Sequence, residues 1–292
     1  MTSSLSSTLE SIARETTIFF GIPTLIGGAL GNILNIIVFL SLRTFRQKSC
    51  VVYLTIMSIV NIIQLTTGLL GRIMITSFNI DWTETSLFFC KFRYFVFPAA
   101  SLISFTCLFF ATIDQYFATS SRPRWQKWSN IKFAYYLTTF STILWVLHGV
   151  PYLILFNQVT SFNQTTCVAS NPIFFQYRLY FVALIFIGFL PVSATIIFGS
   201  LAFHHVRTMN YRAVPLVRRE LDKQLTIMVL TQDVMKFFTV LPYVIVTAIS
   251  LNTGLIQNPN IAIYLRFAMA ISVLFYYFYF AVSMKRELNV ND

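Results

Sequence analysis

Residues 94–116 read YFVFPAASLISFTCLFFATIDQY, and this stretch decides the fold. No charged residue lies from Tyr94 to Ile113, a run of 20 residues, and Asp114, Gln115 and Tyr116 follow at once. A helix of about 20 apolar residues is long enough to cross the hydrocarbon core of a bilayer. We therefore predict a membrane-crossing helix with an acid and an amide at one of its ends.

The composition of the whole chain is also that of a membrane protein. Of the 292 residues, 56% are hydrophobic and 11% are charged, whereas soluble domains carry about 25% charged residues. The mean hydropathy is +0.69. The net charge of +11 comes from short cationic clusters between apolar runs, a pattern that favours a lipid bilayer over nucleic acid as the partner. The first 15 residues lack the basic start and apolar centre of a cleavable signal peptide.

Seven apolar runs of membrane-spanning length follow one another along the chain. Helices are expected, because a helix satisfies its own backbone hydrogen bonds in lipid, and no run alternates in polarity as a barrel strand does. The loops are short, so consecutive helices are expected to be antiparallel neighbours. We predict an all-α fold, a seven-transmembrane helix bundle in a single domain of residues 1–292, with helices near 18–41, 51–76, 87–119, 131–156, 174–206, 222–250 and 260–284.

The cations indicate the orientation of these helices. The loops after the first, third and fifth runs, the first two residues of the runs that follow them and the segment after the seventh run hold 14 of the 21 Lys and Arg residues, and the other three loops hold none. Because cationic loops stay on the cytoplasmic side, we expect an extracellular N-terminus and a cytoplasmic C-terminus. The protein is accordingly expected to be a multi-pass protein of the plasma membrane.

Two of the four cysteines fall in segments that this topology places outside the cell. Cys90 opens the third run, and Cys167 lies between the fourth and fifth runs. An oxidising compartment favours a disulfide between them, while Cys50 and Cys107 are expected to be free thiols. Asn163 begins an Asn-Gln-Thr sequon in the same outer loop, which predicts N-glycosylation.

A set of residues in a fixed order runs through the predicted helices. Asp114-Gln115-Tyr116 ends the third helix about 36 Å from Cys90 along a helix, and the other members are Gly31-Asn32, Trp145, Pro191 and Pro242. The set resembles the motifs of the rhodopsin-like (class A) G-protein-coupled receptors, and the resemblance covers essentially the whole chain. It implies a receptor that responds to an extracellular ligand and signals to heterotrimeric G proteins through movement of helix six.

Four positions depart from the family pattern. Gln115 stands where the family has Arg, Asn61 where it has Asp, Val240 where it has Trp, and residues 276–280 replace the Asn-Pro-x-x-Tyr signature. The chain therefore resembles a divergent member whose ligand cannot be inherited by analogy. Because a neutral Asn61 lacks the charge that a sodium site needs, we expect weak or no sensitivity to sodium.

The resemblance assigns coupling and switching to Asp114, Gln115, Tyr116, Asp222 and Pro242. In the family, the motif arginine is held by the neighbouring acid and by an acid at the base of helix six. Asp222 lies 20 positions before Pro242, where that second acid belongs. Gln115 can hydrogen-bond to Asp222 but cannot form an ion pair, so we expect a looser contact and higher basal activity or a weaker switch. Alternatively, Asp114 and Gln115 merely face interfacial water. Pro242 predicts a kink in helix six.

Polar residues also lie in the middle of the predicted bundle. Asn32 and Asn61 are expected to make hydrogen bonds between helices. Asp233 and Lys236 are three residues apart, so they share a helix face. Charges inside a membrane suggest function, although we favour a mutual ion pair.

Four arginines, Arg72, Arg93, Arg178 and Arg266, lie one or two turns inside the outer ends of helices two, three, five and seven. If they face the bundle axis, they form a cationic mouth for a carboxylate, a phosphate or an acidic peptide. If they extend to lipid headgroups, they have no role in ligand binding. The position at which amine receptors place an aspartate is Phe97, which argues against a biogenic amine.

Other classes of membrane protein fit less well. A retinal photoreceptor needs a lysine in helix seven, and residues 267–284 contain none. There are no repeated halves, as a transporter would show, and no acid or histidine cluster that predicts an enzyme, a metal or a cofactor. We predict a receptor for a peptide or an anionic small molecule. The alternative is a seven-helix protein that is ligand-gated or transport-like and does not couple to G proteins.

Overall fold

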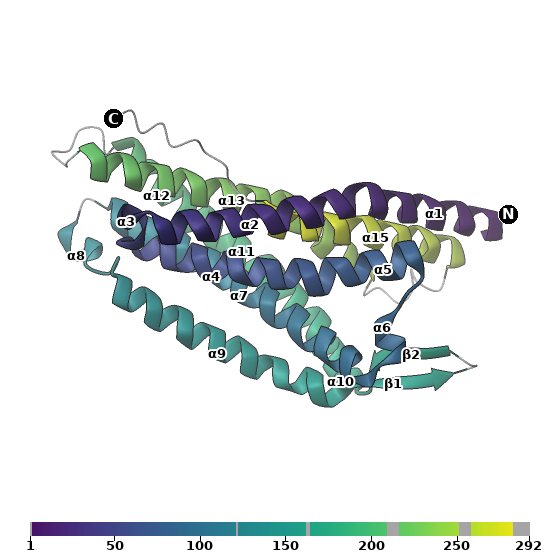
Figure 1. Cartoon of the computed structure of the whole chain (residues 1–292). Helices are drawn as coiled ribbons and strands as arrows, with labels where there is room; N and C mark the ends of the chain where they lie inside the picture. The colour runs from purple at the N-terminus through teal and green to yellow at the C-terminus, as the bar shows by residue number, and fades with distance from the viewer. Residues whose placement is uncertain (1, 121, 162–163, 209–215, 251–257, 283–292) are drawn as a thin grey trace.

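The computed structural model describes residues 2–120, 122–161, 164–208, 216–250 and 258–282. Within these residues, seven helices are long and apolar enough to cross a membrane, and they run side by side as one elongated bundle (Figure 1). These spans are Ser6–Ser41, Ser49–Phe78, Leu87–Thr119, Ile131–Leu155, Pro172–Phe189, Leu221–Ser250 and Asn260–Ala281. The predicted seven-helix architecture is therefore confirmed.

The first helix begins earlier than the sequence analysis predicted. It consists of α1 (Thr2–Thr16), the π-helical turn η1 (Thr17–Gly21) and α2 (Ile22–Ser41), whereas the predicted start was near residue 18. Ala13 and Thr17 are buried and lie one turn apart, on a face of α1 and η1 that hydropathy alone does not reveal. α1 contacts α5 (Leu70–Phe78) and α15 (Pro259–Ala281), so packing extends this helix beyond its apolar run.

The remaining spans are built from the following elements. The second joins α4 (Ser49–Gln64), η2 (Leu65–Leu69) and α5, the third is α7 (Leu87–Thr119), the fourth is α9 (Ile131–Leu155), and the seventh is α15. The fifth joins α10 (Pro172–Gln176) and η3 (Tyr177–Phe189), and α11 (Leu190–Ala194), η4 (Thr195–Gly199) and α12 (Ser200–Thr208) continue that helix beyond the span. The sixth lies within α13 (Leu216–Ser250). Short helices α3 (Arg43–Arg46), α6 (Trp82–Thr85) and α8 (Pro123–Gln126) connect them.

A β-hairpin corrects the expectation of a purely helical chain. Strands β1 (Phe156–Ser161) and β2 (Gln164–Ala169) pair in antiparallel register, with Gln158 opposite Cys167. The segment is rich in Thr and Val, whose β-branched side chains favour strands. The predicted disulfide between Cys90 and Cys167 is present and ties β2 to the start of α7. Asn163 lies outside the described residues.

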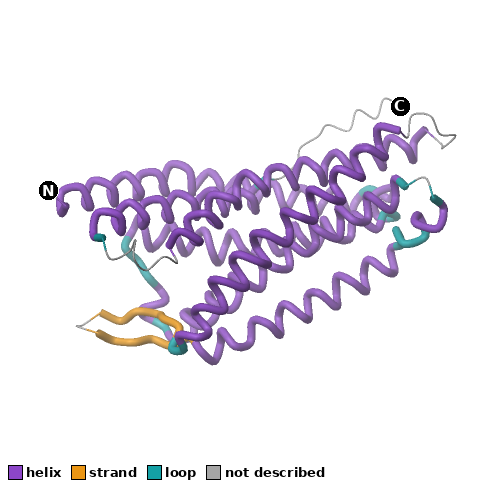
Figure 2. The backbone as a smooth tube through the Cα atoms, turned by 180° about the vertical axis from the view of Figure 1, so that it is seen from behind, coloured by secondary structure: helices purple, strands orange, loops and turns teal. Residues whose placement is uncertain are grey.

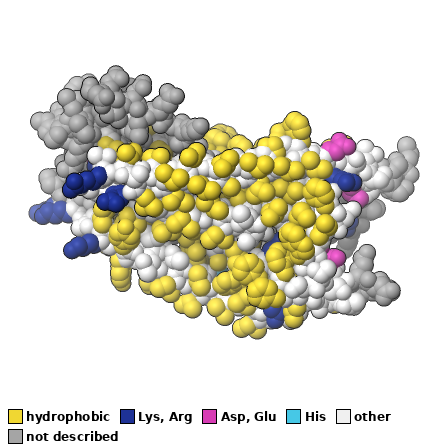
Figure 3. All heavy atoms as spheres, in the orientation of Figure 1, with side chains coloured by type: hydrophobic (Ala, Val, Ile, Leu, Met, Phe, Trp, Pro, Cys, Tyr) yellow, Lys and Arg dark blue, Asp and Glu magenta, His cyan; other side chains and the backbone are white. Residues whose placement is uncertain are grey.

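The two ends of the bundle differ in their elements. The hairpin and the start of α1 lie at one end, and α3 and α8 lie at the other (Figures 1 and 2). We call these the hairpin end and the Asp114 end. Hydrophobic side chains cover the middle of the face in Figure 3, with groups of Lys and Arg toward the Asp114 end. Such an apolar belt suits a surface that faces lipid.

Candidate functional site

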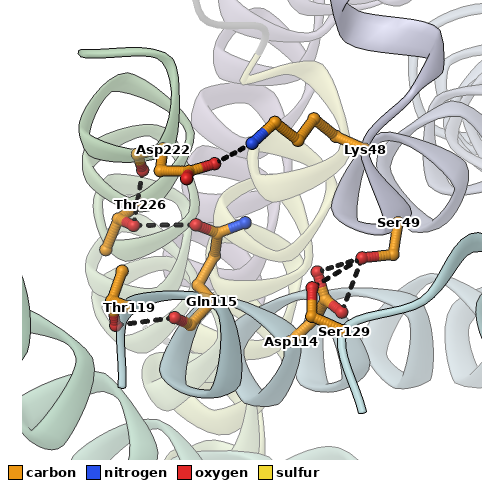
Figure 4. A network of polar contacts seen from close by, with 8 residues as sticks. All are labelled: Lys48, Ser49, Asp114, Gln115, Thr119, Ser129, Asp222 and Thr226. Atoms are coloured by element: carbon orange, nitrogen blue, oxygen red, sulfur yellow. Dashed lines mark hydrogen bonds and ion pairs between the residues drawn. The ribbon is translucent and has the colours of Figure 1, made fainter. Parts of the chain in front are cut away.

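Asp114 lies near the end of α7 and is held by hydroxyl groups. Its side chain is buried, and both carboxylate oxygens are 2.8 Å from Ser49 Oγ, which is the donor (Figure 4). Ser49 is the first residue of α4, and its Oγ is 2.9 Å from Ser129 Oγ. Asp114 therefore connects the third helix to the start of the second helix and to the loop before the fourth, and it does not lie open at the interface.

Gln115 is buried and faces α13. Its Oε1 accepts a hydrogen bond of 2.7 Å from Thr226 Oγ1, which is also 2.7 Å from the backbone oxygen of Asp222. The backbone oxygen of Gln115 accepts a hydrogen bond of 2.8 Å from Thr119 Oγ1. Gln115 thus reaches helix six through a neutral hydroxyl group and meets the turn of Asp222 only indirectly (Figure 4).

Asp222 forms its ion pair with Lys48, the residue before α4. The Lys48 side chain is 22% exposed and that of Asp222 is 8% exposed. A cavity of about 450 Å³ lies beside the two groups, and Ser49, Asp114 and Gln115 also line it. The Asp114 end therefore combines a polar cavity with contacts that join the second, third and sixth helices.

Tyr116 points to a different neighbourhood from its two predecessors. Its ring stacks on His205 of α12 at 5.2 Å between ring centroids, and it lies edge-on to Trp125 of α8 at 5.8 Å. The three motif residues therefore contact three different parts of the bundle: Asp114 the second helix, Gln115 the sixth, and Tyr116 the fifth.

The predicted polar core forms a chain of hydrogen bonds between helices. Asn32 Nδ2 donates to the backbone oxygens of Gly28 at 2.8 Å and Phe280 at 2.9 Å. Asn61 Nδ2 lies 3.4 Å from Asn32 Oδ1, and Asn61 Oδ1 accepts from Ser104 Oγ at 2.6 Å. The first, second, third and seventh helices are thus joined near mid-bundle.

Asp233 and Lys236 are buried on α13. Asp233 Oδ2 accepts a 2.7 Å hydrogen bond from Thr112 Oγ1 of α7, and Lys236 Nζ lies 4.2 Å from the ring centroid of Phe105. The two charged groups also interact electrostatically with each other. Lys236 therefore has both an acidic neighbour and an aromatic face, which stabilise a cation in a dry interior. Pro242 lies within the same helix, two turns further on.

Three of the four arginines have defined surroundings toward the hairpin end. A methyl group placed on Gly71 of α5 would lie 3.1 Å from Arg93 Cζ, so the guanidinium of Arg93 rests against that helix. Arg72 and Arg93 interact with each other and with the buried Tyr277 of α15. Arg178 lies over the rings of Phe156 and Phe175 at 5.7 and 5.4 Å.

Of the two remaining predicted residues, Arg266 lies apart from these arginines and Phe97 lies near Tyr277. Arg266 is exposed on α15 and is not among the partners of Arg72, Arg93 and Arg178 described above. Phe97 packs between α7 and α15, with its ring 5.9 Å from Tyr276 and 6.1 Å from Tyr277. The structure therefore brings together Arg72, Arg93 and the Phe97–Tyr277 contact, and it leaves Arg266 apart.

Four polar residues at the Asp114 end were not singled out from the sequence: Lys48, Ser49, Ser129 and Thr226. Each lies within about one or two turns of a predicted helix end. If all predicted helix ends on the same side of the membrane are considered together, these four residues fall near Asp114 and Asp222. Their partners, however, depend on how the helices pack.

Comparison with known proteins identifies the family to which the chain belongs. No curated protein matches the chain. The sequence model described as 7 transmembrane receptor (rhodopsin family) matches residues 31–282, which is most of the chain and includes parts of all seven spans. Receptors of this family are multi-pass proteins of the plasma membrane and are not enzymes. The chain belongs to the rhodopsin family of seven-transmembrane receptors.

Proposed function

We propose that this receptor binds an extracellular anionic ligand through Arg72 and Arg93 and couples to heterotrimeric G proteins by movement of α13. The observation that supports the ligand class is the guanidinium of Arg93, which lies against Gly71, the residue before Arg72, while both arginines influence Tyr277 electrostatically from two other helices. Two like charges that converge in a bundle are suited to share an anion.

The electrostatics of the pair support an anion as the missing partner. Among the described residues, no carboxylate lies within ion-pair distance of Arg72 or Arg93. The side chains of Arg72 and Arg93 are both partly buried, and like charges in such a poorly hydrated region repel each other. The planar fork of a guanidinium matches the two oxygens of a carboxylate or a phosphate. The guanidinium of Arg93 lies against Gly71 of α5. This contact favours an Arg93 side chain that faces the helix bundle over one that extends to lipid headgroups.

The structure of the Asp114 end supports the proposed coupling to G proteins. There, α13 meets the second and third helices through few polar contacts beside a cavity of about 450 Å³. Pro242 interrupts the backbone hydrogen bonds of α13, which lets one half of a helix swing relative to the other. In the proposed orientation, with the N-terminus outside the cell, the cavity faces the cytoplasm, where a G protein binds.

A panel of paired carboxylic acids and their methyl esters tests the ligand class. In cells that express the receptor, we expect one or more acids to activate a G-protein sensor and the matching esters to remain silent. Arg72→Gln and Arg93→Gln are each expected to weaken the response about tenfold or more, because each removes a charged contact worth roughly 1.5–3 kcal/mol. Arg266→Gln is the matched control and is expected to respond normally. Equal activity of acids and esters, or equal loss in all three variants, would contradict the proposal.

A second candidate function is favoured by one observation. Gln115 stands at the motif position where the family has Arg, and it makes a neutral contact with Thr226. A seven-helix protein without G-protein coupling would tolerate this change. Measurement of ion or solute flux in the same cells separates the two functions, since flux without recruitment of a G protein supports this alternative.

A further inference from the structure

The loop between the first and second helices carries a cation that reaches helix six. Lys48 follows the C-cap residue of α3, Gln47, and is the N-cap residue of α4. Its backbone N–H donates to the oxygen of Phe45 at 2.9 Å, and its own oxygen accepts from Val51 N–H at 3.2 Å. Lys48 is therefore held on a short, hydrogen-bonded loop, and its ammonium group is paired with Asp222 of α13.

The Lys48–Asp222 pair is partly shielded from water and lies beside a cavity. With exposures of 22% and 8%, both side chains are partly removed from water. Water screens such a pair less than a surface pair, which is worth about 0–1 kcal/mol. The adjacent cavity is lined by Ser49, Gln126 and Ser129 as well as by the pair itself. Asp222 can thus be rehydrated when it leaves Lys48.

The two motif residues of α7 beside the pair, Asp114 and Gln115, do not supply such a cation. Asp114 is acidic and accepts from Ser49, and Gln115 is neutral and accepts from Thr226. Neither group can attract the Asp222 carboxylate as a cation does. The ionic restraint on helix six therefore comes from the first loop and not from the third helix.

We propose that Lys48 is the positioning residue that holds the Asp114 end of α13 against the bundle, and that activation requires the Lys48–Asp222 pair to break. Its effect on signalling rests on the function proposed above, whereas its effect on the position of α13 does not. Through Lys48, the chain keeps an ionic restraint on helix six although Gln115 stands at the arginine position of the motif.

The test measures the position of α13 and the basal signal in the same variants. Lys48→Gln and Asp222→Asn each remove one charge, Lys48→Arg keeps the charge, and Lys48→Asp combined with Asp222→Lys exchanges the partners. Lys127→Gln is the matched control, because Lys127 is an exposed cation of the next loop at the same end. Spin labels at positions 132 on α9 and 224 on α13 report the separation of these helices in the purified full-length receptor.

We expect Lys48→Gln and Asp222→Asn to raise the population with a longer label separation about fivefold, in line with the coupling of a partly buried charge pair. The charge-retaining, exchanged and control variants are expected to match the parent protein. Unchanged distances in both charge-removing variants would overturn the inference, as would equal shifts in Lys48→Gln and Lys48→Arg. If the exchanged variant fails to fold, the comparison of Lys48→Gln with Lys48→Arg still shows whether the charge at position 48 holds α13.

The two readouts separate the inference from the proposed function. A longer label separation without any G-protein signal supports the role of Lys48 and contradicts coupling. A ligand-induced G-protein signal with no change of distance in Lys48→Gln contradicts the role of Lys48 and leaves coupling intact.

Discussion

Gly27 and Gly28 are neighbours on α2 but have different surroundings. A Cβ atom on Gly28 would lie 2.5 Å from Cβ and 2.7 Å from Cα of Ala281 on α15, whereas a Cβ on Gly27 would have no neighbour within 4 Å. The contact at Gly28 involves backbone, which cannot turn away as the end of a flexible side chain can. The absence of a side chain at Gly28 is therefore what allows the first and seventh helices to touch.

Substitution of the two glycines is expected to give opposite results. Gly28→Ala forces α2 away from α15 and is expected to cost about 1–3 kcal/mol, as overpacking does. Gly27→Ala is expected to be neutral or to stabilise by up to about 1 kcal/mol, because alanine favours helix. Thermal unfolding of both variants in detergent checks this. Equal melting temperatures would mean that the contact with Ala281 does not limit packing.

Individual residues could be predicted from the sequence better than their partners could. Asp114 and Asp222 were identified by position along helices of known rise. Lys48 lies 174 residues from Asp222, and its contact depends on how the second and sixth helices sit around the third. Local patterns carry no information on that packing, so Gln115 was expected to meet Asp222 and instead meets Thr226.

Helices could be predicted from the sequence where a single segment determines its own secondary structure. The third span is α7, at the predicted residues 87–119, because a long uncharged run has only helix available in lipid. The early start of α1 and the hairpin of β1 and β2 were missed, since both depend on contacts with other elements. Gln158 Nε2, for example, donates to the backbone oxygens of Thr83 and Glu84 at 2.8 and 3.0 Å, which fixes β1 against α6.

The disulfide attaches the hairpin covalently to α7, beside the stacked rings of Tyr94 and Phe156. Cys90 and Cys167 are 77 residues apart, and a cross-link over such a loop stabilises a fold by about 2–5 kcal/mol. Cys167→Ser is therefore expected to lower the melting temperature and to reduce the amount of receptor at the cell surface. Cys107→Ser is the control, because Cys107 is a buried free thiol, and it is expected to have a smaller effect. Similar losses in the two variants would show that the disulfide is not what holds this end together.

At the scale of the whole molecule, the distribution of charge bears on orientation. The loops of the Asp114 end are those with the Lys and Arg residues, and the loops of the hairpin end have none. Cationic loops are retained in the cytoplasm during insertion. The disulfide lies at the hairpin end, and disulfides persist in oxidising compartments. The charge distribution and the disulfide thus independently favour the proposed orientation, in which the hairpin end lies outside the cell.

Epitope tags at the two termini test this orientation in intact cells. We expect an antibody to stain the N-terminal tag before permeabilisation and the C-terminal tag only afterwards, because seven crossings put the termini on opposite sides. An antibody to a cytoplasmic protein, silent before permeabilisation, shows that the cells are intact. A sugar on Asn163, removed by a glycosidase and lost in Asn163→Gln, would place the hairpin loop outside by a separate route. Staining of both tags on one side would mean an even number of crossings and would contradict the proposed orientation.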